Sequence, residues 1–181
     1  MFRSQIYIAS LLLLMFVASA KDQTGVPDLE VTAPVDGAVF RLSEARGRYV
    51  ALHFLLKTEC PFCQRHVREY VQRAAELPDV VQVFLKPDSE EEIRRWVARS
   101  GMDTTNKVAI YRDPNARWAK AFRIPFGYEF HGELVHYPAL LIIDKKNHEA
   151  FRHVGQTNAD RYRFAQLMNK ISELKVAESL P

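Results

Sequence analysis

The chain has 181 residues, of which 48% are hydrophobic and 26% are charged, as in a globular protein with one substantial core. The formal net charge is only +3, and the mild basic clusters have acidic neighbours. This balance does not indicate a nucleic-acid-binding protein. Cys60 and Cys63 are the only cysteines, so each has just one possible intramolecular partner.

The first twenty residues have the three-part pattern of a secretory signal peptide. Arg3 precedes an apolar stretch over 6–17, and the small residues of 18–20 offer a cleavage site before Lys21. The apolar stretch is shorter than the roughly 20 residues that span a membrane, which favours cleavage over an uncleaved anchor. We therefore expect export across the cytoplasmic membrane to the periplasm, and no stable membrane association after cleavage.

The mature chain reads as one domain over 36–176, between a flexible lead-in at 21–35 and a tail at 177–181. Apolar runs predict strands, and apolar residues at helical spacing predict helices. In chain order we expect a strand at 38–42, a strand at 49–56, a helix from the cysteines to before Pro78, a strand at 80–85, a helix that begins near Ser89, a strand at 108–111, a helix at 115–122, a loop over 123–137, strands at 139–144 and 148–154, and a helix at 160–174.

Strands that alternate with helices, followed by a closing hairpin and helix, predict an α/β sandwich with a mixed central sheet. The strands at 49–56 and 139–144 are continuous apolar runs. Such runs are typical of strands that are covered by helices on both faces.

The two cysteines form a Cys-x-x-Cys motif between a strand and a helix, the layout of a dithiol–disulfide redox site. The first turn of a helix has unpaired N–H groups and the positive end of the helix dipole, which favour a thiolate. We expect Cys60, at the start of the helix, to be the nucleophile. Cys63 lies one turn further, should be more buried, and would resolve a mixed disulfide.

Two other interpretations of the motif are weaker. A structural zinc site needs two more ligands, and only His148 and His153 have a loosely suitable spacing, within a predicted hairpin. An inert structural disulfide is the other alternative. The strand–motif–helix context favours a redox site without a bound metal or cofactor.

Together, the motif with its flanking strand and helix, Tyr137-Pro138 before the strand at 139–144, and the final hairpin and helix resemble the thioredoxin-like superfamily. The segment from Asp36 to Leu52 resembles the opening of its redoxin branch, which includes AhpC/TSA and TlpA-like proteins. The resemblance covers roughly residues 35–175. It implies a thioredoxin-like three-layer sandwich.

The resemblance also implies an activity and a substrate-binding surface. It implies a cis Tyr137–Pro138 bond beside the dithiol, with the backbone before Pro138 pairing with an incoming peptide. Pro61-Phe62 resembles the Pro-aromatic dipeptides of related redox sites, which adds Phe62 to the expected substrate contacts. The implied activity is thiol–disulfide exchange with protein disulfide or dithiol substrates and a redox partner protein. Electron flow is not fixed by the sequence, although TlpA-like proteins favour a reductase.

Two further activities remain as alternatives. A peroxiredoxin-like thiol peroxidase has a Pro-x-x-x-Thr-x-x-Cys signature, but here His53 and Lys57 occupy its Pro and Thr positions, and Pro138 stands where its arginine would be. For thiol–disulfide exchange, the resemblance to thioredoxin implies a buried acid that assists the second thiol. The site of this acid holds Phe54 here, so that proton relay is missing. Copper delivery is the third possibility, since His131 and His136 lie in the loop expected near the dithiol, although the two-residue gap between the cysteines argues against it.

The loop before Pro138 contains four aromatic residues: Phe126, Tyr128, Phe130 and Tyr137. They could cover one end of the sheet as ordinary core. Alternatively, they could offer apolar contacts to a peptide substrate beside the reactive sulfur.

Overall fold

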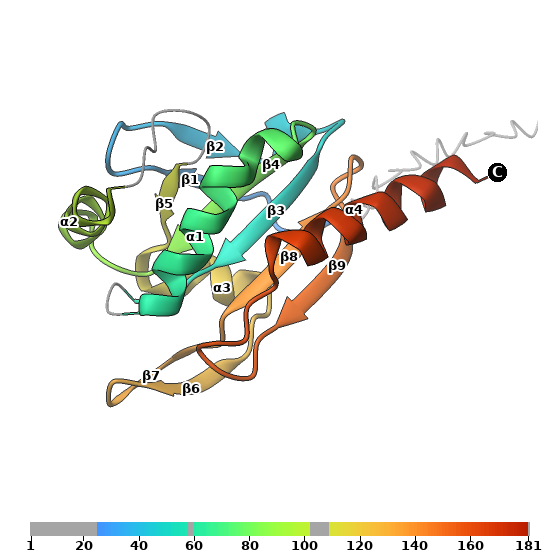
Figure 1. The fold of residues 1–181 in the computed structure, drawn as a ribbon. Helices are drawn as coiled ribbons and strands as arrows, with labels where there is room; N and C mark the ends of the chain where they lie inside the picture. Colours follow the sequence, from blue (N-terminus) through green and yellow to red (C-terminus); the bar gives the residue numbers. More distant parts are fainter. Residues whose placement is uncertain (1–24, 58–59, 102–108, 181) are drawn as a thin grey trace, which may run out of the picture.

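The computed structural model describes residues 25–57, 60–101 and 109–180. The predicted signal peptide and its cleavage site lie outside these residues. A five-stranded sheet with the order β5-β4-β3-β8-β9 forms the centre of the molecule (Figure 1). Its strands are β3 (Tyr49–Phe54), β4 (Val80–Lys86), β5 (Ile110–Arg112), β8 (Ala139–Ile143) and β9 (Glu149–Val154). β3, β4 and β5 are parallel, whereas β8 is antiparallel to both β3 and β9, so the sheet is mixed as predicted.

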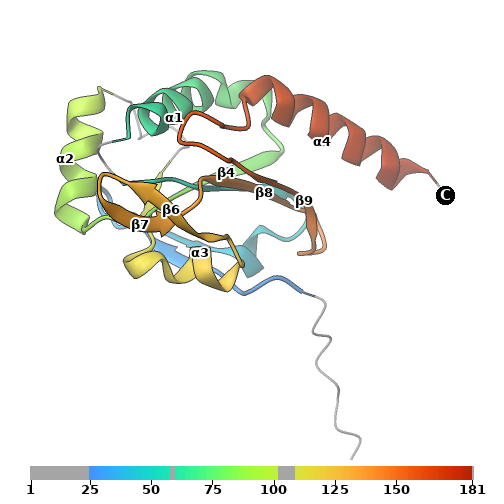
Figure 2. The same ribbon diagram turned by 90° about the horizontal axis from the view of Figure 1, so that it is seen from below.

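Two layers cover the sheet. Side chains of α1 (Pro61–Arg73), α2 (Glu90–Ser100) and α4 (Phe164–Ser179) form the core on one face. The other core includes side chains of α3 (Arg117–Ala121), β1 (Glu30–Thr32) and β2 (Val39–Arg41). Figure 2 shows α1 and α4 on one side of the sheet and α3 on the opposite side. The predicted three-layer, thioredoxin-like α/β fold is therefore confirmed.

The continuous apolar run of β3 reflects burial on both faces. All six of its residues are buried. Tyr49 and Ala51 point into the core under α1, while Val50 and Leu52 point into the opposite core. Because successive side chains of a strand alternate between faces, a strand between two cores must be apolar at nearly every position.

Local sequence signals explain where the first two helices begin. Cys60 is the N-cap of α1, and Pro61 occupies the first helical position, where its missing N–H costs nothing. Ser89 caps α2 in a capping box with Glu92. Gly101 ends α2 with a left-handed conformation, φ 61°.

The structure differs from the prediction most clearly in three places. The expected loop at 123–137 contains a hairpin of β6 (Phe126–Phe130) and β7 (Glu133–His136), because its aromatic residues alternate with Gly127 and Glu129. The end of the lead-in forms β1, paired with β2. The last helix begins at Phe164 rather than at residue 160, and it extends to Ser179 through part of the predicted tail.

The sheet register brings separate parts of the chain to one edge. Phe54 at the end of β3 pairs with Leu85 of β4 and with Ala139 at the start of β8, and Ala139 pairs with Val154 at the end of β9. The segments that follow β3, β4 and β9, and the segment that precedes β8, therefore meet at this edge. Among the described residues, no helix is long and apolar enough to cross a membrane.

Candidate redox site

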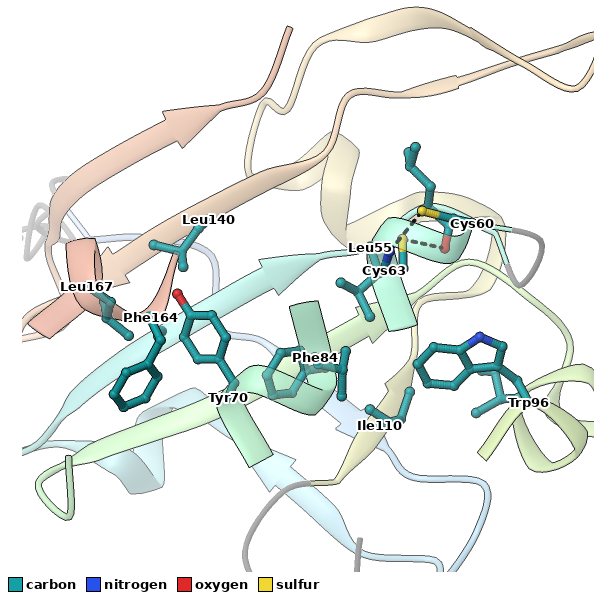
Figure 3. Close-up of a cluster of buried hydrophobic side chains, with 14 of the residues drawn as sticks. Leu55, Cys60, Cys63, Tyr70, Phe84, Trp96, Ile110, Leu140, Phe164 and Leu167 are labelled. Atoms are coloured by element: carbon teal, nitrogen blue, oxygen red, sulfur yellow. Dashed lines mark hydrogen bonds between the residues drawn. The ribbon is translucent and has the colours of Figure 1, made fainter. Parts of the chain in front are cut away.

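The two cysteines lie at the edge of the sheet where these segments meet. The backbone N–H of Cys63 donates a hydrogen bond of 3.0 Å to Cys60 Sγ, as expected for a side chain at the N-cap of a helix (Figure 3). Both cysteines are free thiols. Their exposed fractions are 1% for Cys60 and 0% for Cys63. Cys63 was expected to be clearly more buried than Cys60, and this difference in exposure is not found.

An arginine from the connection between β9 and α4 contacts both sulfur atoms. Arg161 Nη2 lies 3.3 Å from Cys60 Sγ and 3.2 Å from Cys63 Sγ. The same connection contributes Asn158, whose Oδ1 accepts from the Cys60 thiol at 2.8 Å and from Arg161 Nη2 at 2.9 Å. Arg161 Nε also donates to the Asn158 carbonyl, at 2.9 Å. A guanidinium group and an amide oxygen thus surround Cys60 Sγ.

A buried lysine contacts the same backbone carbonyl as the Cys63 thiol. Lys86, with an exposed fraction of 0%, donates to the Leu56 carbonyl at 2.8 Å and lies 3.3 Å from Asp88 Oδ2. The Cys63 thiol contacts the same Leu56 carbonyl at 3.9 Å. The Lys86 ammonium is also 4.7 Å from the centre of the Trp96 ring, a cation–π contact. Since a buried charge needs partners, this set of contacts explains how the lysine is accommodated.

The pKa values of the two thiols move in opposite directions. Burial raises the pKa of Cys63, but the hydrogen bond with Cys60 and the charges of Arg161 and Lys86 outweigh burial and bring this pKa to about 6. The hydrogen bond with Cys63, burial and the Cys63 charge raise the pKa of Cys60, against the effects of Arg161 and the Cys63 N–H. The expected lowering of the Cys60 pKa is therefore wrong for this state. The dithiol loses one proton easily and holds the second.

The three predicted substrate-binding residues have different surroundings. Phe62 is half-buried, with the Arg65 guanidinium 5.7 Å from its ring centre. Pro138 is buried, and its carbonyl accepts from Gly155 N at 2.8 Å. The Tyr137 N–H donates to the Pro125 carbonyl at 2.9 Å, so this backbone group is already paired within the chain. The described residues contain no cis peptide bond, so the Tyr137–Pro138 bond is trans, contrary to the resemblance.

The β6–β7 hairpin is joined to the site by side-chain contacts. The Tyr128 hydroxyl accepts from Asn158 N at 2.8 Å, and the Tyr128 and Tyr137 ring centres are 5.3 Å apart. Lys57, three residues before Cys60, forms an ion pair with Glu133 of β7. Glu59, which directly precedes Cys60, lies outside the described residues.

The aromatic residues of the hairpin divide into two groups. Phe130 is buried in the core that includes both cysteines, so the core interpretation is right for this residue. Phe126 has an exposed fraction of 69%. It borders an apolar cavity of about 450 Å³ together with Ile124 and residues of α3. Phe126 is therefore available for contact with another molecule.

A second buried polar group lies further along α1. His53 Nδ1 and His66 Nε2 are 2.9 Å apart, and His53 Nε2 is 2.8 Å from Gln82 Oε1. Burial lowers the pKa of His53 to about 3 and places the pKa of His66 well below its ordinary value. Both imidazoles are therefore neutral near pH 7. Because Gln82 Oε1 can only accept, His53 Nε2–H donates to it, and His53 Nδ1 accepts from His66 Nε2–H.

The described residues contain no group of three or more His, Cys, Asp or Glu side chains that could hold a metal ion. His136 is buried, with Nδ1 2.7 Å from the Tyr137 carbonyl. His131 is exposed in the turn between β6 and β7. The described structure thus offers no support for the copper and zinc alternatives.

Arg161, Asn158 and Lys86 were not predicted as site residues from the sequence. Arg161 fell inside the predicted last helix, and Lys86 fell directly after the predicted strand at 80–85, where a single charged residue gives no motif. One signal was available: in the predicted sheet, the connections after β3 and β9 leave from the same edge. That topology places polar residues from 155 to 163 beside the cysteines.

The sheet order, the layers and a Cys-x-x-Cys at the start of the first long helix define a thioredoxin-like redox protein. The model of the AhpC/TSA family matches residues 23–148, and the chain belongs to this family. A search of curated proteins found no match.

Solved structures show the same fold at low sequence identity. A peroxiredoxin-like protein from Aquifex aeolicus is 16% identical, with a TM-score of 0.68, and the match covers 83% of this chain and 86% of that protein. A PrxQ variant from Xylella fastidiosa is 13% identical, with a TM-score of 0.69 and coverage of 81% and 89%. The exposed lipoprotein thioredoxin of Streptococcus pneumoniae is 22% identical, with a TM-score of 0.58 and coverage of 81% and 98%.

Proposed function

We propose that the protein is an extracytoplasmic thiol–disulfide oxidoreductase that exchanges disulfides with protein substrates through Cys60 and Cys63. One observation carries the proposal: Arg161 Nη2 lies within hydrogen-bond reach of both sulfur atoms, at 3.3 and 3.2 Å, where the N–H groups of α1 begin. A cation between two thiols stabilises the thiolate that attacks disulfides.

The exchange proceeds in two displacement steps. The Cys60 thiolate attacks one sulfur of the substrate disulfide, the substrate S–S bond breaks, and one substrate sulfur leaves as a thiolate. Cys63 then loses its proton and attacks Cys60 Sγ, which releases the second substrate thiolate and forms the Cys60–Cys63 disulfide. The two substrate thiolates take up protons, so the substrate gains two electrons and the protein dithiol loses two.

The position of Cys60 supports its role as nucleophile. It is the N-cap of α1, whereas Cys63 is inside the first turn. Both sulfur atoms contact the same Arg161 Nη2, so transfer of one proton from Cys60 to Cys63 leaves the negative charge on Cys60 beside this cation. We assign Phe62, Tyr137 and Pro138 to the surface that meets the substrate.

Replacement of each cysteine tests the proposal. Cys60→Ser should abolish reduction of insulin disulfides in the presence of a dithiol, because no nucleophile remains. Cys63→Ser should form a mixed disulfide that mass spectrometry detects, because Cys60 can still attack but nothing resolves the product. Full turnover by Cys60→Ser would disprove the mechanism.

The direction of electron flow follows from the reduction potential of the Cys60–Cys63 pair against glutathione. The TlpA-like resemblance favours a reductase. Arg161 and Lys86 act in the other direction, since a cation that stabilises the thiolate also stabilises the reduced protein and makes the pair more oxidising.

We also propose export, on the pattern of residues 1–20, with a redox partner protein outside the cytoplasm. The intact mass of the exported protein should correspond to a chain that begins at or near Lys21. A membrane-bound form that keeps residues 1–20 would contradict cleavage.

Reduction of hydroperoxides is the second candidate, because Arg161 supplies a cation beside Cys60 although Pro138 occupies the arginine position of the peroxiredoxin pattern. The Cys60 thiolate would attack a peroxide oxygen, break the O–O bond and become a sulfenic acid, while the alcohol or water leaves with one proton. Cys63 would then form the disulfide and release water. Hydrogen peroxide consumption that saturates at micromolar peroxide and disappears in Cys60→Ser would favour this activity.

A further inference from the structure

Two side chains of the connection between β9 and α4, Asn158 and Arg161, contact the sulfur of Cys60. Cys60 has an exposed fraction of only 1%, too little for a sulfur that must meet a protein disulfide. Asn158 Oδ1 lies 2.8 Å from Cys60 Sγ and accepts a hydrogen bond from its thiol group. A substrate disulfide must approach the same sulfur, so this amide and a substrate compete for one position.

Asn158 is fixed in place through its backbone as well as its side chain. Its N–H donates to the Tyr128 hydroxyl at 2.8 Å, and its carbonyl accepts from Arg161 Nε at 2.9 Å. The connection starts at Gly155, whose N–H is bonded to the Pro138 carbonyl. A Cβ at Gly155 would lie 2.2 Å from the Asp160 carbonyl oxygen, so the tight path of the connection requires glycine.

The chemistry of the amide oxygen makes this contact specific for the thiol. A carbonyl oxygen accepts a hydrogen bond from S–H, but it cannot bond to a thiolate or to a disulfide sulfur, which have no proton to donate. A thiolate on Cys60 would face the oxygen without a bond between them. Arg161 Nη2, whose acceptors are both sulfurs and the Asn158 oxygen, has the opposite preference, because a cationic N–H donor bonds more strongly to a thiolate than to a thiol.

We propose that Asn158 covers Cys60 and holds its proton, and that a substrate must displace Asn158 before Cys60 becomes the reactive thiolate. In the covered state, the negative charge of the dithiol rests on Cys63. Once Asn158 moves away, Cys60 can pass its proton to Cys63, and Arg161 holds the thiolate on the sulfur that has just been exposed. Asn158 is thus a positioning residue, and this role rests on the proposed function of Cys60 as nucleophile.

Other groups around the dithiol must be considered for any pH dependence. Those that face it are Cys63 of α1, Arg161 of the connection and Lys86 of β4. Burial lowers the pKa of three nearby histidines, and the Arg161 charge lowers it further. They are His53 of β3, His66 of α1 and His136 of β7. All three are neutral above pH 7, so a change of reactivity in that range reports on the thiols.

Alkylation of the reduced protein by iodoacetamide, followed by mass spectrometry at Cys60 from pH 5 to pH 10, tests the proposal. In this reaction the Cys60 thiolate displaces iodide and forms a C–S bond. Asn158→Ala should raise the rate near pH 7 about five- to tenfold, the factor expected for loss of one hydrogen bond, and shift the midpoint of the pH profile to lower pH. Asn158→Asp has nearly the same shape but adds a negative charge, so its midpoint should move to higher pH.

Two more variants separate the role of Asn158 from a general loosening of the connection. Tyr128→Phe removes the hydroxyl that accepts from the Asn158 N–H and keeps the Asn158 side-chain amide. It should therefore also raise the alkylation rate of Cys60, but by a smaller factor than Asn158→Ala. Gln156→Ala removes an exposed amide from the same connection and should match the wild-type rate and midpoint. Melting temperatures of all variants identify any that are poorly folded, in which case Tyr128→Phe alone decides the result.

Two outcomes would overturn the proposal: wild-type rates in Asn158→Ala, or a faster rate with an unchanged midpoint, since Asn158 would then not hold the proton. The alkylation assay needs no protein substrate. Its result is therefore independent of insulin turnover, and failure of the proposed function remains distinguishable from failure of this inference.

Discussion

Cys63 and His66 lie one turn apart on the buried face of α1, yet their surroundings are opposite. Cys63 is contacted by Arg161, and the charges of Arg161 and Lys86 help to lower its pKa to about 6 at the start of the helix. His66 meets another neutral imidazole, His53, and remains uncharged. The comparison shows that one helix face can hold a charged reactive group and a neutral polar pair, provided that each has partners of the right kind.

The largest effect should come from breaking the charged cluster at Lys86. Lys86→Met removes the buried ammonium group that lies 3.3 Å from the buried Asp88 carboxylate, and so breaks a buried ion pair. We expect the free energy of unfolding in urea to fall by about 3–5 kcal/mol. Lys86→Met combined with Asp88→Asn should recover part of this loss, whereas a loss below about 1 kcal/mol in the single variant would show that the pair does not matter for stability.

Arg161 should matter more for the redox potential than for folding. Arg161→Met removes the donor to both sulfurs, so the reduced form loses charge-assisted hydrogen bonds of about 1.5–3 kcal/mol. The reduction potential should become about 30–60 mV more negative in glutathione equilibration. Arg65→Met removes an exposed positive charge from the same helix as the cysteines and serves as the control. Equal shifts in the two variants would mean that only overall charge counts.

The histidine pair should affect acid stability and leave the redox site unchanged. The pKa of His53 is about 3 in the folded chain and about 6.5 when unfolded, so the unfolded chain binds an extra proton between these values. Stability therefore falls as the pH falls through this window, by about 2 kcal/mol for His53 alone between pH 7 and pH 5.

Replacing both His53 and His66 by Leu should flatten this dependence in urea unfolding curves, whatever the stability at pH 7. A wild-type slope in the double variant would refute the assignment. The reduction potential at pH 7 should stay close to the wild-type value, which separates the neutral pair from the charged cluster.

The smallest effect on stability is expected at the exposed end of the hairpin. Phe126→Ala should change the free energy of unfolding by less than about 0.5 kcal/mol, because the ring is mostly exposed. If the ring meets the substrate, insulin turnover should fall about two- to fivefold, with unchanged alkylation of Cys60. Phe130→Ala, a core truncation, should instead cost about 3–5 kcal/mol. Unchanged insulin turnover in Phe126→Ala would remove this residue from the substrate surface.

Much of the fold was readable from local patterns. The buried strands β3 and β8 are continuous apolar runs. Ser89 and Glu92 mark the start of α2, and Pro61 marks the start of α1. The hairpin of β6 and β7 was missed because the alternation in β6 covers only Phe126–Phe130 and includes Gly127 and Glu129, residue types that are uncommon in strands. The start of α4 was misplaced because no Ser, Thr, Asp or Asn caps it at Arg163.

By itself, the sequence determined the α/β class, the order of the five central strands and the four helices, and the position of the dithiol at the start of a helix, because each depends on residues close together in the chain. The tertiary structure alone decided what surrounds the sulfurs. Asn158 and Arg161 are about a hundred positions from Cys60, and Lys86 reaches the site from another strand. Ionisation of a buried thiol depends on charges and hydrogen bonds within a few ångströms, and only the folded chain brings these groups together.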